Sequence, residues 1–192
     1  LLTNSQFEEL LAEYQASNEI DDLNVANEQN DMVEKLIHKF FHFDNSDMSG
    51  KIVAYLNLLF NDIVRFIGKD FTPLNPLMKS EYMTNYCVTQ KDEGLLSFNS
   101  GVDMSKSVAI AFASRYAKEE FHEFDEYVKA SIEDFLNLHN GLFNVNMSNE
   151  FSLELNLCPP EVHEEETLTN ATKIYVFPII FPFGTIHFLM EI

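Results

Sequence analysis

An acid and an amide stand one helical turn apart within a helix that the sequence predicts over residues 123–147. When successive residues are turned by about 100°, Ala130 and Gly141 flank Asp134 and Asn137 in one stripe. Because both flanking residues are small, another protein could approach the carboxylate and the carboxamide closely. The spacing therefore predicts a helix that presents a polar pair to a partner.

The other side chains of this predicted helix separate into an apolar and a polar side. The bulky apolar groups on one side are Phe124, Val128, Phe135, Leu138 and Leu142. The polar groups opposite are Glu126, Glu133, Asn137, Asn140 and Asn144, with Asp134 on the border. His139 falls on the apolar side, so we expect a histidine in the core or at its border.

Other kinds of catalytic site find little support in the sequence. There is no glycine-rich phosphate loop, no nucleophile elbow and no zinc-type cysteine spacing. His38 and His42 stand four residues apart, a spacing that can bind a metal on one helix face. Neither a Glu beside the first His nor a third ligand follows nearby, so a plain helix surface is expected there. We expect the chain to hold no metal and no cofactor of its own.

Charge and cysteine content narrow the possible partners. The net charge of −19 argues against nucleic acid or an anionic membrane, because phosphate contacts need a basic surface. No apolar run reaches the roughly 18 residues of a transmembrane helix. Cys87 and Cys158 lie in apolar, strand-like stretches and are expected to be buried free thiols, with a disulfide or a redox role as the alternative. Together these features predict a soluble, cytoplasmic protein.

The length of 192 residues suits one domain with an added helical segment. With 46% hydrophobic residues the chain can bury a full core without disulfides or metal. Residues 1–50 hold eleven acids against two lysines, and a polar stretch at 17–30 is typical of a linker. We therefore predict an N-terminal helical extension or linker over residues 1–47 and the main domain over residues 48–192.

The order of the predicted elements indicates an α+β fold. Helices are expected at 49–67, from Asp103 or Ser105 to 118, and at 123–147. Strands are expected at 81–89, 95–100, 151–157, 173–180 and 185–192, with a turn at 90–94, an acidic loop at 162–170 and a hairpin turn at 181–184. This succession of helix, strands, two helices and strands predicts long helices packed on a mainly antiparallel sheet.

From about residue 52 to residue 192 the chain resembles the CheC/CheX/FliY family of chemotaxis phosphatases, and CheX in particular. The resemblance includes the helix before Phe71-Thr-Pro, the segment Glu93-Gly-Leu-Leu-Ser-Phe and the hairpin at 176–184. The active motif of the family is a small polar residue, a Glu four positions later, an Asn three after that, and a Pro twenty-three further on. Asn137 and Pro160 hold this spacing, Asp134 stands at the Glu position, and Ala130 stands at the leading position.

The resemblance implies a CheC-like fold and a phosphatase that hydrolyses the aspartyl phosphate of a CheY-type receiver domain. It implies that Asp134 pairs with the active-site lysine of the receiver and that Asn137 aligns the attacking water. The Mg²⁺ belongs to the receiver, and proteins of the CheX kind are homodimers joined through their sheets. The residues expected to contact the receiver are Ala130, Glu133, Asn140, Gly141 and Pro160.

Two departures from the motif leave a second reading open. Asp134 is one methylene shorter than Glu, which reduces its reach by about 1.5 Å. Ala130 lacks the hydrogen-bonding group of a Ser or an Asp, and Glu133, although longer, points about 100° away from Asp134 on the helix. The alternative is a non-catalytic binding or output module that recognises a receiver or dimerises on the same fold. A third reading makes residues 1–50 the interaction surface.

Overall fold

The computed structural model describes residues 46–94 and 97–191. The chain divides into two compact units, Leu1–Arg65 and Phe66–Ile192. The expected N-terminal extension and the His38–His42 pair lie almost wholly outside the described residues. The boundary between residues 47 and 48 stays a prediction.

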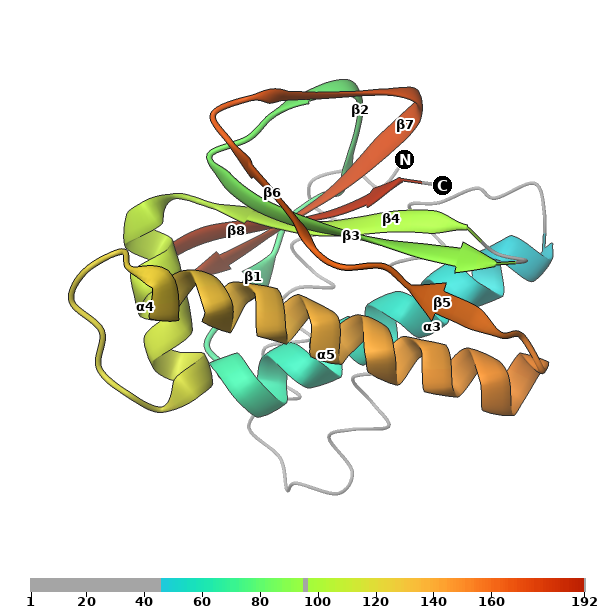
Figure 1. The fold of residues 1–192 in the computed structure, drawn as a ribbon, viewed down its shortest axis with the longest axis horizontal. Coiled ribbons are helices and arrows are strands. Elements are labelled where there is room, and N and C mark those ends of the chain that lie inside the picture. Colours follow the sequence, from blue (N-terminus) through green and yellow to red (C-terminus); the bar gives the residue numbers. More distant parts are fainter. Residues whose placement is uncertain (1–45, 95–96, 192) are drawn as a thin grey trace. The chain divides into compact units, whose positions relative to one another are not determined.

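The helix predicted at 49–67 is confirmed. Helix α3 runs from Ser46 to Asp62, and the π-helical segment η1 (Ile63–Ile67) continues it (Figure 1). Its apolar side chains are buried at Ile52, Val53, Leu56, Leu59, Ile63 and Ile67. The segment ends at Gly68, whose φ of +140° is a backbone conformation that residues with a Cβ rarely adopt.

The second unit is built on one antiparallel sheet. Its strands follow the order β1-β7-β8-β4-β3-β5, with β2 paired to β7 and β6 paired to β3. The strands are β1 (Thr72–Pro73), β2 (Leu77–Met83), β3 (Tyr86–Gly94), β4 (Phe98–Met104), β5 (Leu155–Leu157), β6 (Glu161–Glu164), β7 (Thr167–Phe181) and β8 (Gly184–Glu191). Helices α4 (Lys106–Ala117) and α5 (Glu126–Phe151) connect β4 to β5. The predicted α+β architecture is confirmed.

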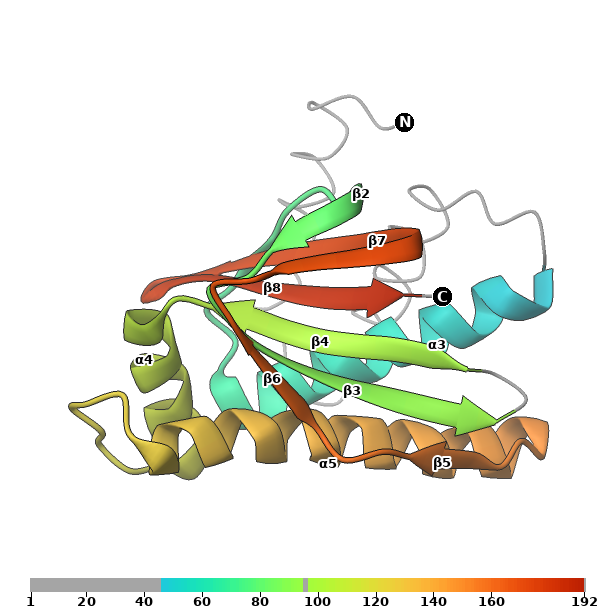
Figure 2. The ribbon, with the colours of Figure 1, turned by 45° about the horizontal axis from the view of Figure 1, so that its top comes forward.

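Helix α5 lies lengthwise along one face of this sheet, beside β3, β4 and β5 (Figures 1 and 2). The β3–β4 register places Gln90 opposite Ser100 and Cys87 opposite Asp103. Because side chains alternate between the faces of a strand, these two pairs lie on opposite faces of the sheet. Gln90 and Ser100 are on the face toward α5, since both bond to Asn140 of that helix.

Apolar packing holds α5 to the sheet and to α4. The buried apolar side chains of the helix are Val128, Ile132, Phe135, Leu136, Phe143 and Met147. Phe143 meets Phe98 of β4 edge to face at 5.5 Å, and Phe135 meets Phe112 of α4 at 5.2 Å. His139 is buried as well, so its predicted place in the core is confirmed. This packing gives α5 a rigid base for the polar residues on its other side.

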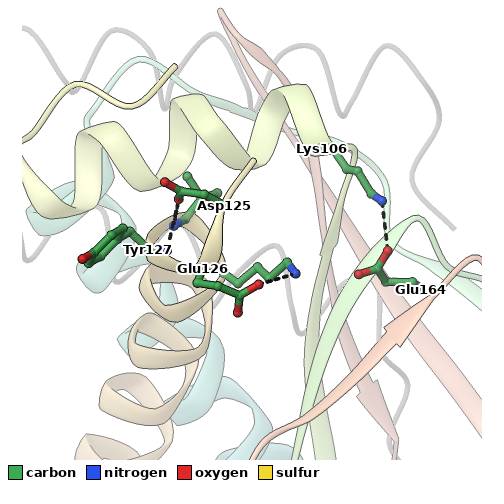
Figure 3. Close-up of polar contacts among 7 residues, drawn as sticks. Lys106, Asp125, Glu126, Tyr127 and Glu164 are labelled. Carbon is green, nitrogen blue, oxygen red and sulfur yellow. Dashed lines mark hydrogen bonds and ion pairs between the residues drawn. The ribbon is translucent and has the colours of Figure 1, made fainter. Parts of the chain in front are cut away.

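The first turn of α5 is fixed by a capping residue (Figure 3). Asp125 accepts hydrogen bonds from the backbone N–H groups of Tyr127 and Val128, both at 3.1 Å. The ion pairs Lys129–Glu126 and Lys106–Glu164 lie around this end of the helix at 2.8 and 2.9 Å. They are largely exposed, so they contribute little stability. The cap explains why the helix begins at Glu126 rather than at the predicted residue 123.

Several predicted boundaries in the sheet were wrong. The strand expected at 81–89 is divided between β2 and β3, and the turn expected at 90–94 belongs to β3. The segment resembled a turn because its side chains are polar, but Gln90 and Asp92 point inward and bond to α5. The acidic loop expected at 162–170 contains β6 and the start of β7, and the strand expected at 151–157 shortens to β5.

Other local predictions were confirmed. Helix α4 has Ser105 as its N-cap, and β7 and β8 form the predicted hairpin. Both cysteines are free; Cys87 is buried in β3, whereas Cys158 is only half-buried and follows β5. Within the described residues, no helix is long and apolar enough to cross a membrane.

Candidate functional site

Asp134 and Asn137 lie one turn apart on α5, and both are exposed. Residues three apart on a helix are neighbours on its surface, so the carboxylate and the carboxamide lie side by side. Each is held by a hydrogen bond from a different element of the second unit. The predicted pair is therefore a surface feature with two independent supports.

Tyr116 of α4 supports the acid. Its hydroxyl donates to Asp134 Oδ2 at 2.6 Å. The ring of Tyr116 stacks on Phe112 and meets Phe135 edge to face, with centroid distances of 6.3 and 5.7 Å. Because the ring is packed, the hydroxyl restrains the carboxylate and leaves Oδ1 without a hydrogen bond from the described residues. This oxygen can accept a hydrogen bond from a cationic group of a partner.

Gln90 of β3 supports the amide. Its Nε2 donates to Asn137 Oδ1 and to the backbone carbonyl oxygen of Cys158, each at 2.9 Å. Gln90 is only 1% exposed, although it reaches an exposed residue. Its two N–H groups are both used. Gln90 therefore links the Asn137 carboxamide to the sheet and to the backbone at Cys158, two residues before Pro160.

Asn140 and Ser100 complete this arrangement, and we call Gln90, Ser100, Asn137 and Asn140 the amide cluster. Asn140 is 0% exposed, and its Nδ2 donates to Gln90 Oε1 and to Ser100 Oγ, both at 2.9 Å. This burial corrects the prediction that Asn140 itself contacts a partner. A polar residue on a helix wheel was taken to face solvent, but the buried amide of Gln90 on β3 and the buried hydroxyl of Ser100 on β4 satisfy its hydrogen bonds.

The remaining predicted contact residues lie around the pair with different exposures. Ala130 is exposed one turn before Asp134, and Glu133 and Pro160 are half-buried. Gly141 is half-buried one turn after Asn137, and a Cβ added there would meet no atom within 4 Å. Its small size is therefore not required by packing inside the described part of the chain. The space beside it is open to an approaching partner.

A buried carboxyl group lies further along the same helix–strand contact. Asn144 Nδ2 donates to Asp92 Oδ1 at 2.6 Å, and Asp92 is fully buried. Burial raises the pKa of Asp92 to about 6, against the opposing effect of this hydrogen bond. Within the described residues, Asp92 Oδ2 and Asn144 Oδ1 are buried without a partner. A proton on the carboxyl group would make Asp92 a donor as well as an acceptor.

The chemistry open to this site is positioning and charge placement. Among the described residues, no group of three His, Cys, Asp or Glu side chains could hold a metal ion. A carboxylate can bind a cation, and a carboxamide can both donate to and accept from water. Such a pair can act on a partner that brings its own reactive group.

The sequence did not single out Tyr116 and Gln90 as functional residues. Tyr116 belongs to the predicted helix of small residues, and Gln90 belonged to a predicted turn. They lie 18 and 47 residues away from the side chains they hold. The sequence offered no clear local signal for Gln90, because residues 86–90 of β3 are all buried and lack the alternation of a half-buried strand.

No family model matches this chain, and no curated protein matches it. Solved structures do. A CheC-like superfamily protein from Shewanella sp. PV-4 is 16% identical with a TM-score of 0.64, and the match covers 77% of this chain and 97% of that one. The chain has a CheC-like fold.

Two further structures share the CheC-like fold. The chemotaxis protein CheX from Desulfovibrio desulfuricans is 14% identical with a TM-score of 0.60; the match covers 73% of this chain and 97% of that chain. A structure described as the CheX–CheY–BeF₃–Mg²⁺ complex from Borrelia burgdorferi is 17% identical with a TM-score of 0.61, covering 73% and 96%. Almost the whole length of each solved chain is therefore represented here, whereas about a quarter of this chain lies outside the match.

Proposed function

We propose that this protein is a CheX-like phosphatase that hydrolyses the aspartyl phosphate of a CheY-type receiver domain in chemotaxis or two-component signalling. The observation that carries the proposal is the exposed pair of Asp134 and Asn137, each held by a side chain from another element. The pair lies on a long, well-packed helix of a CheC-like fold. A rigid helix suits insertion of two side chains into the pocket of a partner.

The proposed reaction needs no covalent step on this chain. Water attacks the phosphorus, the bond between phosphorus and the aspartyl oxygen of the receiver breaks, and inorganic phosphate and a free carboxylate result. Catalysis of phosphoryl transfer rests mainly on positioning and charge placement. Asn137 orients the attacking water, and Asp134 engages the active-site lysine of the receiver. Mg²⁺ is expected on the receiver, where it neutralises charge on the phosphoryl oxygens.

Two further observations support a receiver as the partner. The Borrelia burgdorferi structure that shares this fold is a complex of CheX with CheY, BeF₃ and Mg²⁺. The net charge of −19 also suits a partner that presents a lysine, because opposite charges speed association.

The alternative is a binding or output module that recognises a receiver without hydrolysing its phosphate. One observation favours it: the Tyr116 hydroxyl already occupies Asp134 Oδ2, on a side chain that is shorter than Glu. An acid held toward the neighbouring helix α4 binds a lysine of a partner less readily than one that extends freely. Tight binding to a phosphorylated receiver without turnover would support this alternative.

A homodimer joined through the sheets is proposed on the basis of exposed apolar side chains. Leu77, Met78 and Met83 of β2 are 47%, 58% and 64% exposed. Exposed apolar side chains on a sheet strand favour pairing with another chain. Sedimentation of the protein and of a Met78→Lys variant would test this, since the variant should shift toward the monomer.

The phosphatase is tested by measuring phosphate loss from phosphorylated receivers of the source organism with and without this protein. The proposal predicts faster loss, abolished by Asn137→Ala. Asp134→Glu should be faster than the parent if the short acid limits the rate. No acceleration with any of several receivers would contradict the proposal.

A further inference from the structure

The orientations of the Gln90, Asn137 and Asn140 amides follow from one backbone group. The carbonyl oxygen of Cys158 can only accept, so the Gln90 atom at 2.9 Å from it must be the nitrogen Nε2. The same nitrogen lies 2.9 Å from Asn137, so the Asn137 atom that faces it must be the oxygen. The orientation of the Asn137 amide is therefore dictated by the backbone through Gln90.

The same assignment extends to the other end of Gln90. Its oxygen Oε1 lies 2.9 Å from Asn140, which must present its nitrogen there. The second N–H of Asn140 donates to Ser100 Oγ at 2.9 Å. Asn140 and Ser100 are buried, so neither amide can turn over without leaving a buried polar group unpaired. Two acceptors and one donor thus hold Gln90 in a single orientation.

We infer that Gln90 is a positioning residue that makes Asn137 present its NH₂ group outward. Asn137 Oδ1 is engaged on the sheet side, so its two N–H donors are the groups left for a partner. Among the described residues, no acceptor bonds them. This inference rests on the proposed function for its chemical meaning: the outward donors meet an oxygen atom, of the attacking water or of the phosphoryl group. A carboxylate at position 137 could not do this.

Replacing Gln90 should misorient the Asn137 amide without weakening the binding of the receiver. Gln90 is buried and does not contact a partner. Without its hydrogen bond the Asn137 amide can rotate about its side-chain torsions, and a misplaced group of this kind lowers rates by roughly 10 to 100-fold. KM for the receiver should change little, because the exposed surface of α5 is kept.

The test uses Gln90→Met, which keeps the volume and removes the donors, and Asn137→Asp, which keeps an acceptor toward Gln90 and removes the outward donors. Thr89→Val is the matched control, since Thr89 is the neighbouring buried residue on β3, lies on the opposite face and bonds through one side-chain contact to His163. Gln90→Met and Asn137→Asp should each lower kcat at least 10-fold with KM little changed, whereas Thr89→Val should keep the parent values. Parent-like kcat in either of the first two variants would overturn the inference.

A second readout does not depend on activity. Both Gln90 Nε2 protons should exchange slowly with solvent in ¹H–¹⁵N spectra. The proton that faces Asn137 should stay protected in Asn137→Asp and lose protection in Asn137→Ala, whereas the proton bonded to the Cys158 carbonyl should stay protected in both. Gln90 signals that exchange rapidly in the parent protein would overturn the inference. If the parent accelerates no phosphate loss, the proposed phosphatase fails, and a protected Gln90 proton that loses protection in Asn137→Ala would still support the positioning role.

Discussion

Two polar clusters lie on opposite faces of the β3–β4 strand pair. One reaches an exposed side chain, whereas the hydrogen bonds of the other stay within the cluster. The amide cluster faces α5 and contains neutral side chains that lead to the exposed Asn137. The other face holds the fully buried carboxylate of Asp103, which is contacted by side chains of three other residues. We call these four residues the Asp103 cluster: Asp103, Tyr82, Asn85 and His187. Its acceptors are used by groups of the cluster itself. One cluster orients a surface group, whereas the other holds β2 to the sheet.

The hydrogen bonds of the Asp103 cluster show that its members bond to one another. Asp103 accepts from Tyr82 Oη at 2.8 Å and from the backbone and side chain of Asn85 at 2.7 and 3.1 Å. Tyr82 has one proton, which it gives to Asp103, so at 2.6 Å His187 must donate its Nδ1–H to the Tyr82 oxygen. Burial lowers the pKa of His187 against the opposing charge of Asp103. The cluster therefore favours structural cohesion rather than contact with a partner.

The largest effect in this comparison should come from Asp103→Ala. The change leaves the buried Tyr82 hydroxyl without its carboxylate acceptor and removes the acceptor of the exposed Asn85, and hydrogen bonds to a charged group are strong. We expect the free energy of unfolding to fall by about 3 kcal/mol or more. Urea unfolding measures this loss, and a loss below about 1 kcal/mol would contradict a structural role for the cluster.

Asn140→Ala should have a smaller effect on stability and an additional effect on the rate. Removing its amide leaves Gln90 Oε1 unpaired, which should lower the free energy of unfolding by about 1–3 kcal/mol. Because Gln90 then loses one of its three anchors, the acceleration of phosphate loss should fall as well. A variant that loses stability but keeps the parent rate would show that Gln90 holds Asn137 without Asn140.

The pH dependence of the free energy of unfolding should distinguish the buried acid Asp92 from an acid held in an ion pair. Its pKa rises from 3.8 to about 6 on folding, so the folded protein binds a proton that the unfolded chain has lost. The contribution of Asp92 to stability is therefore full below pH 3.8, declines as pH rises to about 6, and is absent above. Asp70 acts in the opposite sense, because its bond to Arg115 lowers its pKa.

Asp92→Asn isolates this contribution. The amide of the variant can pair with Asn144 at any pH. We therefore expect the parent to lose stability relative to the variant as the pH rises from 3.8 to about 6. Urea unfolding at several pH values gives the difference. A difference that stays constant from pH 4 to pH 7 would contradict the buried, proton-linked state of Asp92.

Local periodicity was enough to predict the helices and the exposed pair. Asp134 and Asn137 are separated by one turn, so any helix over this stretch places them together. The hairpin of β7 and β8 and the cap at Ser105 are also local patterns, and they were predicted correctly. The part of the site that depends on near neighbours in the chain could therefore be read from the sequence.

The supports of the pair could not be predicted, because they depend on distant residues. Gln90 lies in a polar stretch that resembles a turn until α5 covers it and supplies partners for Gln90 and Asp92. Asn140 was placed on the wrong side for the same reason: a buried Asn is stable only where other buried polar groups satisfy it. Tyr116 reaches Asp134 only because α4 packs against α5.

The most direct test of the account compares Asn137→Ala with Tyr82→Phe in phosphate loss from a phosphorylated receiver. Asn137→Ala removes the group that the amide cluster orients, whereas Tyr82→Phe removes the two hydrogen bonds of the Tyr82 hydroxyl from the Asp103 cluster on the other face. We predict that the parent protein and folded Tyr82→Phe accelerate phosphate loss equally and that Asn137→Ala does not accelerate it. Equal rates for the two variants, or full activity of Asn137→Ala, would contradict the account.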